Sequence, residues 1–560
     1  MNVKELIGII RSISFISDVK EVSILDRVNK SITVLISFKM MFNNKNNTFL
    51  IGFKNNFPLS KPYIYLYNWN DYGFIPHVDY NGEVCFAHDE GLFLDYTNPK
   101  GIIESCVKLA KNTLVKGINA ENTTDFLNEF ENYFSQNKHI IGTLTSCVEI
   151  TKDVKVVDIF SFNNNSFIAD SKSSLRAYGF NNITADFSSL KQSKKCIYVH
   201  INKPIMPPGY DENWTRNSII TSIKDRISEN SLRKLNRLLF QNNTTTLLIH
   251  FVAPNNTDCL FAINLDSKGF NQKEKDNDIK LIAVRRRDLQ YCTQRGGVMN
   301  QISNKKVLLI GCGSVGGFIA HNLVKSGVKK LTLVDNDIFN HENIYRHILG
   351  VNAVNENKVD ALKELLESST LKSNIEVFKD TIENIINKRR IKLQSFDLII
   401  SATGNPTVNL WLNNLLITQF EVPIIFTWVD PYGIGGHSIL ANNKKEGCYQ
   451  CLMDENTNHN KAAFYAIDQV FHKTLTSCSS VFTPYGFLDA ELSALECSKL
   501  ALSSLLGLEN DNPTISWKGD SSEFIKNGYK LSERFKLTID QLNEAKYFYK
   551  NDKCETCAKR

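Results

Sequence analysis

The alternation of apolar and polar positions predicts the elements of the C-terminal half most clearly. An apolar strand at residues 307–310 leads into a glycine-rich loop and then into a helix with apolar residues at helical spacing. A second apolar strand ends at Asp335, a later strand covers residues 397–400, and a helical run begins near residue 487. This order of strand, turn, helix and strand predicts a Rossmann-like α/β domain over residues 291–560.

The first 140 residues have a different order, in which strands follow one another without intervening helices. A helix, three apolar runs and two helical segments occur in turn, at residues 3–16, then 21–25, 31–42 and 48–53, then 99–116 and 124–136. Consecutive strands separated by turns rich in Asn and Asp are typical of an antiparallel meander. We therefore predict an α+β domain over residues 1–140.

Residues 141–290 carry the least distinctive pattern. Strand-like runs and a helical stretch at 218–239, rich in Lys and Arg, alternate with loops rich in Asn. We predict an accessory α/β domain that links and spaces the two ends. Three domains in 560 residues agree with the usual domain size of roughly 100–200 residues.

Composition narrows the function classes. The net charge of +6 is small for 560 residues and its cations are dispersed, which argues against direct nucleic-acid binding. No apolar run approaches the length of a membrane span, and the N-terminus lacks the apolar core of a signal peptide. Thirteen cysteines, an odd number, favour a reducing compartment with thiols used for metal binding or catalysis, so we expect a cytoplasmic protein.

The glycine-rich loop predicts a nucleotide site. Gly311, Gly313 and Gly316 follow the first strand with Gly-x-Gly-x-x-Gly spacing. Such glycines let the backbone approach phosphate groups, and the N-terminus of the next helix offers free N–H groups to them. Asp335 follows Gly316 by 19 residues, where an acid can bind ribose hydroxyls.

Polar residues that suit a triphosphate come next. Within 24 residues the chain presents Asp335, Asp337, Asn343, Arg346 and Lys358. An NAD-dependent dehydrogenase has no need for two cations at this place, whereas a site that handles a triphosphate does. The alternative is a structural Rossmann unit with incidental surface charge.

This combination resembles the ThiF/MoeB superfamily, which includes the ubiquitin-activating enzymes, over roughly the last 270 residues. Those enzymes use ATP to adenylate the C-terminal carboxylate of a small protein. The resemblance implies that Asp335 holds the ribose and that Asn343, Arg346 and Lys358 line the triphosphate path. It also implies that Arg295, just before the core, reaches the ATP of a partner subunit in a homodimer. The alternative for Arg295 is a solvated basic face.

The resemblance implies a bound Mg²⁺ as well, which lowers the repulsion between carboxylate and phosphate. The family usually carries an Asp for this ion after a later strand, but Gly404 stands at that place here. Asp337 and Asp430 are other acids near strand ends, and the sequence leaves the metal ligand open.

Two Cys-x-x-Cys pairs predict a structural zinc site. They are Cys448 with Cys451 and Cys554 with Cys557. Each pair can place two thiolates on one Zn²⁺ at tetrahedral angles, and the ThiF-like family has the same arrangement. The alternative is two unrelated buried or redox-active pairs.

Cys478 is the candidate for a thioester. It lies between the two pairs in a stretch rich in Ser and Thr. In several ubiquitin-activating enzymes the thioester cysteine occupies a crossover loop at this position, and the resemblance implies that role for Cys478. The alternative is a buried structural cysteine. Cys497 has apolar neighbours at helical spacing and is expected in the core.

The N-terminal domain resembles the ubiquitin-conjugating enzymes over roughly the first 140 residues. A helix, a meander and a proline-rich turn precede His77, Asn81-Gly82 and Cys85. The resemblance implies that Cys85 accepts an acyl group by transthiolation. The family's His-Pro-Asn triplet is absent, so its oxyanion-stabilising Asn has no counterpart, and Asn81 is expected in a tight turn. His77 has either a structural or a functional role.

Together the predicted domains resemble bacterial ubiquitin transferase fusions of CBASS anti-phage operons. The resemblance implies adenylation of a protein C-terminus, a thioester on Cys478, transfer to Cys85, and ligation to a lysine or other amine. The implied substrate is a CD-NTase or a bacterial ubiquitin-like protein. Activation of a sulfur-carrier protein and a non-catalytic nucleotide-binding scaffold are the alternatives.

Overall fold

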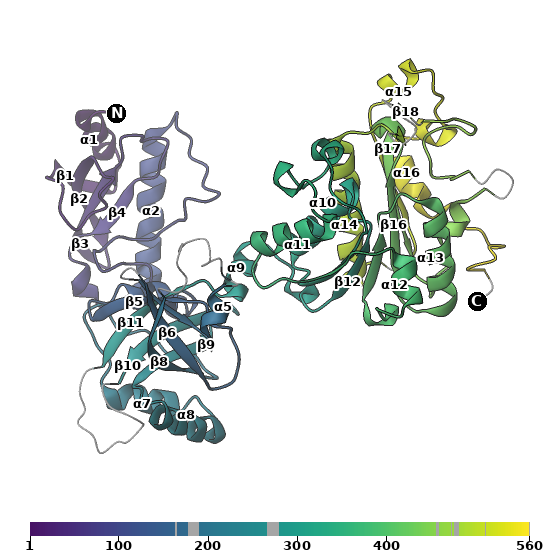
Figure 1. The fold of residues 1–560 in the computed structure, drawn as a ribbon. Coiled ribbons are helices and arrows are strands. Elements are labelled where there is room, and N and C mark those ends of the chain that lie inside the picture. Colours follow the sequence, from purple (N-terminus) through teal and green to yellow (C-terminus); the bar gives the residue numbers. More distant parts are fainter. Residues whose placement is uncertain are drawn as a thin grey trace. The chain divides into compact units, whose positions relative to one another are not determined.

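The structure is a computed structural model that describes residues 1–162, 165–176, 178, 190–265, 279–454, 459–471, 473–474, 481–509 and 511–558. The chain forms two compact units, Met1–Arg176 with Phe180–Asp288, and Ala177–Gly179 with Leu289–Arg560 (Figure 1). The helices in the described part of the chain include none with the length and apolar character that a bilayer span requires.

The first unit begins with the expected helix and meander. Their bounds are α1 (Val3–Arg11), β1 (Ile16–Glu21), β2 (Val34–Phe42), β3 (Lys45–Phe53), β4 (Tyr63–Leu66) and, after a long loop, α2 (Pro99–Ile118). The strands pair antiparallel in sequence order. The expected strand at 21–25 is wrong, because the chain leaves the sheet at Glu21 after Ile16 and Val19 have turned their side chains into the core.

One face of this sheet is covered by α2. The side chains of Ile103, Val107, Ala110 and Leu114 recur at helical spacing and are fully buried against the strands. The segment between β4 and α2, which carries Cys85, runs beside the edge strand β4, where Glu83 pairs with Tyr65.

Residues 140–288 contain a closed barrel, and the helices described in this stretch are α5 (Lys172–Arg176), α7 and α8. Its strands are β5 (Ile140–Ser146), β6 (Lys155–Phe162), β7 (Asn165–Ala169), β8 (Lys191–His200), β9 (Thr246–Val252), β10 (Asp258–Asn264) and β11 (Lys280–Arg286), in the order β10-β11-β5-β7-β6-β8-β9. The expected helix at 218–239 is two helices, α7 (Arg216–Lys224) and α8 (Glu229–Gln241), because Ser228 caps a new start.

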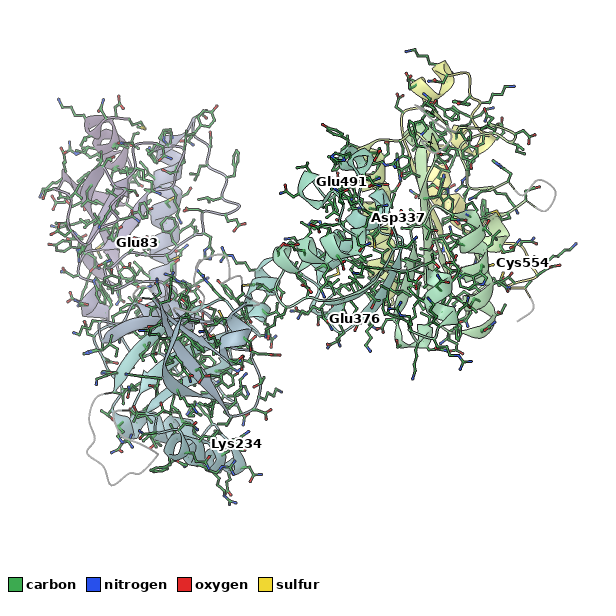
Figure 2. All side chains as sticks on the ribbon, viewed as in Figure 1. Glu83, Lys234, Asp337, Glu376, Glu491 and Cys554 are labelled. Carbon is green, nitrogen blue, oxygen red and sulfur yellow. The ribbon has the colours of Figure 1, made fainter. Side chains whose placement is uncertain are left out.

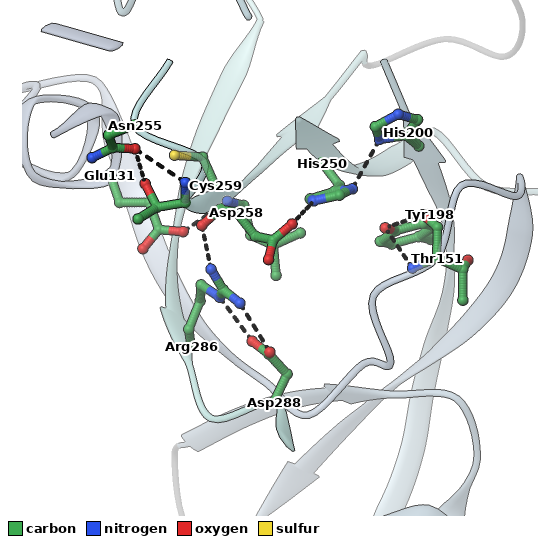
Figure 3. Close-up of polar contacts among 12 residues, drawn as sticks. Glu131, Thr151, Tyr198, His200, His250, Asn255, Asp258, Cys259, Arg286 and Asp288 are labelled. Carbon is green, nitrogen blue, oxygen red and sulfur yellow. Dashed lines mark hydrogen bonds and ion pairs between the residues drawn. The ribbon is translucent and has the colours of Figure 1, made fainter. Parts of the chain in front are cut away.

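A buried polar network lies at one end of the barrel (Figure 3). Arg286 forms two hydrogen bonds with Asp288, at 2.8 and 2.9 Å, and also donates to the Asp258 carbonyl. The Asp258 carboxylate contacts His250 Nε2 at 2.8 Å. Glu131 comes from outside the barrel, and its carboxylate accepts the Leu260 N–H at 2.7 Å. Burial raises the pKa of Glu131 to about 7.

Glu131 belongs to α4 (Phe130–Ser135), which with α3 (Asp125–Asn128) replaces the single expected helix at 124–136. The Phe130 ring lies 5.0 Å from the rings of both Phe251 and Phe261 in the barrel. The helix α4 therefore packs into the barrel core, whereas the first sheet and α2 have a core of their own, and both cores belong to one compact unit.

The second unit is built on a seven-stranded sheet, β14-β13-β12-β15-β16-β17-β20. The strands are β12 (Lys306–Ile310), β13 (Lys330–Val334), β14 (Asn374–Phe378), β15 (Leu398–Ser401), β16 (Ile424–Val429), β17 (Gly435–Ala441) and β20 (Thr514–Lys518). The first five strands in spatial order are parallel, and the last two pairings are antiparallel. The expected Rossmann-like fold is confirmed.

Helices cover this sheet and fix the site at its edge. They include α10 (Ser314–Ser326), α11 (Lys358–Ser369), α13 (Pro406–Gln419) and α14 (Phe487–Leu505). The chain moves outward in opposite directions from β12 and β15, which are neighbours in the sheet. In open α/β sheets a crevice forms at the carboxyl ends of the strands at such a switch point.

Candidate functional site

A cavity of the second unit lies at this switch point. It has a volume of about 780 Å³, and Gly313, Asn343, Arg346 and Lys358 line it. Four of the residues predicted for nucleotide binding therefore meet around one cavity, although they come from three separate segments. The volume lies within the range of small-molecule and cofactor sites.

Two glycines shape the phosphate-binding loop at the end of β12. Gly311 has a φ of +86°, and a Cβ on Gly316 would lie 1.9 Å from the Gly311 carbonyl oxygen. The loop is held by Asp335, whose two carboxylate oxygens accept the N–H groups of Cys312 at 2.7 Å and Asp337 at 2.8 Å. Asp335 thus supports the loop, and its contact with ribose stays a prediction.

Lys358 is oriented before any nucleotide binds. Its Nζ lies 2.8 Å from Asp337 Oδ2, and its side chain is 9% exposed while that of Asp337 is 60% exposed. Figure 2 labels Asp337. The buried stem of Lys358 holds the ammonium group at the N-terminus of α11, where it faces the cavity together with Arg346.

His347 holds the glycine loop against the segment that carries Asn343 and Arg346, and sequence reasoning missed it. Its Nε2–H donates to the Cys312 carbonyl at 2.8 Å, and its Nδ1 accepts the Leu349 N–H at 3.0 Å. Burial lowers the pKa of His347 to about 4. A neutral imidazole is the form that can make both contacts at once.

Tyr485 is a second residue that the sequence did not reveal. Its hydroxyl lies 2.7 Å from Ser314 Oγ, at the start of α10. The Arg346 guanidinium lies over the Tyr485 ring, 5.8 Å from the centroid, which orients a cation that solvent would otherwise leave free to move.

Asp430 is the acid in the wall of this cavity, which also includes Gly404, where the family carries an Asp. Gly404 lines the cavity with no side chain to offer, and its φ of +64° suits glycine. Asp430 is fully buried, and its Oδ2 contacts His437 Nε2 at 2.9 Å and accepts the Phe464 N–H at 2.8 Å. Its Oδ1 has no hydrogen-bond partner in the described part of the chain.

Arg295 lies apart from this cavity. It ends α9 (Leu289–Arg295), is exposed, and has its guanidinium 3.5 Å from the Tyr291 hydroxyl. The described cavity does not include Arg295. Its predicted role at a partner subunit's nucleotide stays a prediction.

The four cysteines of the two pairs meet in one cluster. Their sulfur atoms all lie within 4.8 Å of one another, and the Cys451–Cys557 distance is 3.4 Å. Tetrahedral zinc with bonds of about 2.3 Å requires sulfur atoms about 3.8 Å apart. The Asn413 side chain donates to Cys448 at 3.4 Å, as outer partners of metal ligands do. Figure 2 labels Cys554 in this cluster.

Cys478 lies outside the described residues, so its role stays a prediction. Cys497 is fully buried in the core of the second unit, as expected.

The conjugating-like part presents Cys85 at a second, smaller cavity of about 180 Å³. Cys85 is exposed, and its N–H donates to the His77 carbonyl at 2.8 Å. Asn81 lies in a tight turn before it, as expected. The Asp79 carboxylate accepts the N–H groups of Asn81 and Glu83, and Gly82 has a φ of +85°.

His77 lines this cavity with Cys85. Its Nε2 lies 3.0 Å from Asp125 Oδ2, and its Nδ1 lies 3.9 Å from Glu129 Oε2. The pKa of His77 rises to about 9, first because of its hydrogen bond with the Cys85 side chain and then because of the two carboxylates, against the effect of burial. Neither carboxylate could be assigned to this site from the sequence.

Comparison with known proteins gives the same two modules. Residues 285–507 match the ThiF family, and residues 24–141 match prokaryotic E2 family B. ATP-dependent ubiquitin transferase-like protein Cap2 of Pseudomonas aeruginosa is 23% identical over 442 residues, which are 73% of this chain and 76% of that protein. Its namesake from Escherichia coli is 28% identical over 246 residues, covering 42% of this chain and 39% of that protein.

Two further proteins with other names are also similar to this chain. Adenylyltransferase and sulfurtransferase MOCS3 of Aedes aegypti is 26% identical over 184 residues, which are 32% of this chain and 41% of that protein. A solved structure of E. coli MccB is 16% identical, covers 47% of this chain and 67% of its own, and has a TM-score of 0.34, which is too low for any argument to rest on it.

Proposed function

We propose that this chain, which joins a ThiF family domain to a prokaryotic E2 family B domain, is an ATP-dependent ubiquitin-like activating and conjugating enzyme. The observation that carries the proposal is the presence of two built sites on one polypeptide. One is a nucleotide-sized cavity with two cations, and the other is an exposed thiol with a histidine beside it. Its Cap2 relatives are named for such a transferase activity.

The first step is adenylation of a protein C-terminal carboxylate. The N–H groups at the start of α10 and the cations of Arg346 and Lys358 surround the cavity where the triphosphate would lie. Negative charge accumulates when a carboxylate attacks the α-phosphate, and fixed cations in a partly buried site stabilise it. The leaving group is pyrophosphate.

Two metals are part of the proposal. Bound Mg²⁺ would neutralise phosphate charge, and the unpartnered Oδ1 of Asp430 in the cavity wall is the acid we assign to it in place of the residue missing at Gly404. Zn²⁺ would be held by the four clustered cysteines and would fix the C-terminal segment to the α13 side of the sheet.

The acyl group then moves between thiols. Cys478 attacks the acyl-adenylate, its thioester forms, and AMP leaves. Cys85 attacks that thioester and takes the acyl group, and a lysine or other amine of the target takes it from Cys85 as an amide. We assign the substrate to the CD-NTases of CBASS anti-phage defence, with a ubiquitin-like protein as the second candidate. We further infer a cytoplasmic homodimer that does not act on nucleic acid or membranes.

A sulfur-carrier activator, as the name of the MOCS3 relative suggests for that protein, would leave the Cys85 site without a purpose.

The deciding experiment incubates the full chain with ATP, Mg²⁺ and a candidate substrate and follows adducts that reductant removes. Cys85→Ala should retain one adduct on the activating part and lose the amide product, and Cys478→Ala should lose both adducts. Cys292→Ala, at a half-exposed cysteine outside both sites, is the matched control. Normal amide formation by Cys85→Ala would overturn the proposal.

A further inference from the structure

The Cys85 cavity contains more than the thiol. Asp125 Oδ2 lies 3.0 Å from His77 Nε2, and His77 and Cys85 line the same cavity. This order of acid, imidazole and thiol is the arrangement by which a histidine is oriented for proton transfer beside a nucleophile. The three residues come from different segments of the first unit.

The backbone fixes His77 in this position. Its N–H donates to the Tyr133 hydroxyl at 2.8 Å, and its carbonyl accepts the Cys85 N–H at 2.8 Å. His77 has a φ of +61°, a conformation that residues with a side chain rarely adopt and that the surrounding structure must hold. Its side chain is 19% exposed, so an incoming group can still reach the ring.

We propose that His77 is the catalytic proton acceptor when an amine attacks the Cys85 thioester, and that Asp125 is the positioning residue that holds its ring. This proposal rests on the proposed function and assigns a residue to its last step. The His-Pro-Asn triplet of the ubiquitin-conjugating enzymes is absent from this chain. The resemblance to those enzymes therefore does not predict this role for His77.

Acylation itself would prepare His77 for this role. The groups that act on the ring are Cys85, Asp125 and Glu129, and the hydrogen bond with the Cys85 side chain is the largest cause of the raised pKa of His77. Acylation of Cys85 removes this hydrogen bond, so the proton on His77 becomes easier to lose.

The step balances with groups that are present. The amine nitrogen forms a bond to the thioester carbonyl carbon, and the carbon–sulfur bond breaks. The proton of the amine goes to His77, and the electron pair of the broken bond stays on the Cys85 sulfur. The products are an amide, an imidazolium and a thiolate.

The cavity also favours a particular substrate class. Carboxylates of Asp79, Glu83 and Glu129 line it, and Figure 2 labels Glu83 there. Burial raises the pKa values of Asp79 and Glu83, and the side chain of Glu129 is 36% exposed. A wall of carboxylates attracts a cation, so we infer that the substrate is a primary amine such as a lysine side chain, which arrives as an ammonium and attacks after it has lost one proton to solvent.

The test separates discharge from ATP-driven loading. Cys85 of the full chain is acylated by exchange with a peptide thioester, which is confirmed by mass spectrometry of the Cys85 peptide, and free lysine is then added in a single turnover. His77→Gln should slow discharge about 100-fold at pH 7.5, the lower range for loss of a general base. Asp125→Asn should slow it less, because the ring remains. His88→Gln, at an exposed histidine three residues beyond Cys85, is the matched control and should discharge normally.

The pH profile distinguishes catalysis from support of the fold. Both proteins need the free amine, but only the unaltered chain also needs a neutral imidazole. Its discharge rate should therefore rise more steeply with pH than that of His77→Gln until the acylated-state imidazole is neutral, and the two slopes should be equal above that pH. Equal discharge rates in the two proteins, or parallel pH profiles, would overturn the proposal. If the unaltered chain discharges normally but never loads Cys85 with ATP and any candidate substrate, the proposed function fails while this inference stands.

Discussion

Replacing Lys358 by Met should weaken ATP binding without disturbing the fold. The Lys358 side chain is largely buried, so Met fills nearly the same volume along the stem. The substitution leaves Asp337 without its ion-pair partner, but Asp337 is 60% exposed and its charge stays hydrated. We therefore expect the second unit to unfold at nearly the same temperature as in the unaltered chain.

The magnitude follows from one lost charged hydrogen bond. Hydrogen bonds to charged groups contribute about 1.5–3 kcal/mol, which corresponds to a loss of about 10- to 150-fold in affinity. The freed Asp337 carboxylate would repel the phosphates and add to this loss. The double variant Lys358→Met with Asp337→Asn should therefore bind ATP more tightly than Lys358→Met alone.

Isothermal titration of ATP into the full chain measures these differences without a protein substrate. Lys363→Met is the matched control, because Lys363 lies on the same helix, is 39% exposed, and contacts Glu367 at 3.7 Å. Surface changes of this kind stay within about 0.5 kcal/mol, or roughly twofold in affinity. An ATP affinity of Lys358→Met equal to that of Lys363→Met would refute the assignment of Lys358 to the triphosphate path.

Three further outcomes concern metals and pH. By metal analysis, the purified chain should contain about one equivalent of zinc, and the Cys554→Ser variant should contain less than half of that. Equal zinc contents in the two proteins would contradict the four-cysteine site. Asp430→Asn should lower the apparent affinity for Mg²⁺ in ATP turnover roughly tenfold or more, while ATP binding without metal should be unchanged. An unchanged Mg²⁺ titration would exclude Asp430 as the Mg²⁺ ligand. The folded-state pKa of His347, about 4, lies below the usual value of 6.5, so unfolded chain takes up the proton first as pH falls. Denaturant unfolding should therefore show a loss of about 2 kcal/mol between pH 7 and pH 5, and His347→Gln should lose less; equal losses would exclude His347 as the cause.

The local parts of the nucleotide site could be predicted from the sequence. The strand before Gly311 and the helix after it are continuous in the chain, so spacing alone reveals them. The prediction that Arg346 and Lys358 share one site depends on the sheet, because both lie in segments that follow β13. Parallel strands end at one edge, and a motif that follows such a strand must lie there.

The supporting residues could not be predicted, because their partners are distant in the chain or are backbone atoms. Asp125 lies 48 residues from His77, and no spacing rule connects an acid on a short helix to a histidine in a loop. His347 bonds the carbonyl of Cys312 and so carries no side-chain signature of its role. The barrel was missed for a related reason. It pairs β11 with β5, which are distant in the chain, whereas apolar runs alone fit open and closed sheets equally well.

The short helix α4 connects the barrel with the cavity that contains Cys85. Phe130 and Phe134 on one face of α4 are buried in the barrel core, while Tyr133 on the other face holds the backbone of His77. Tyr210, from a loop of the barrel segment, donates its hydroxyl to the Val78 carbonyl beside the same cavity. A barrel that moved independently would pull these groups away from Cys85 and break both hydrogen bonds. We therefore predict that the barrel and the conjugating-like part move as one piece in the proposed transfer of the acyl group, so that a flexible spacer would lie elsewhere in the chain.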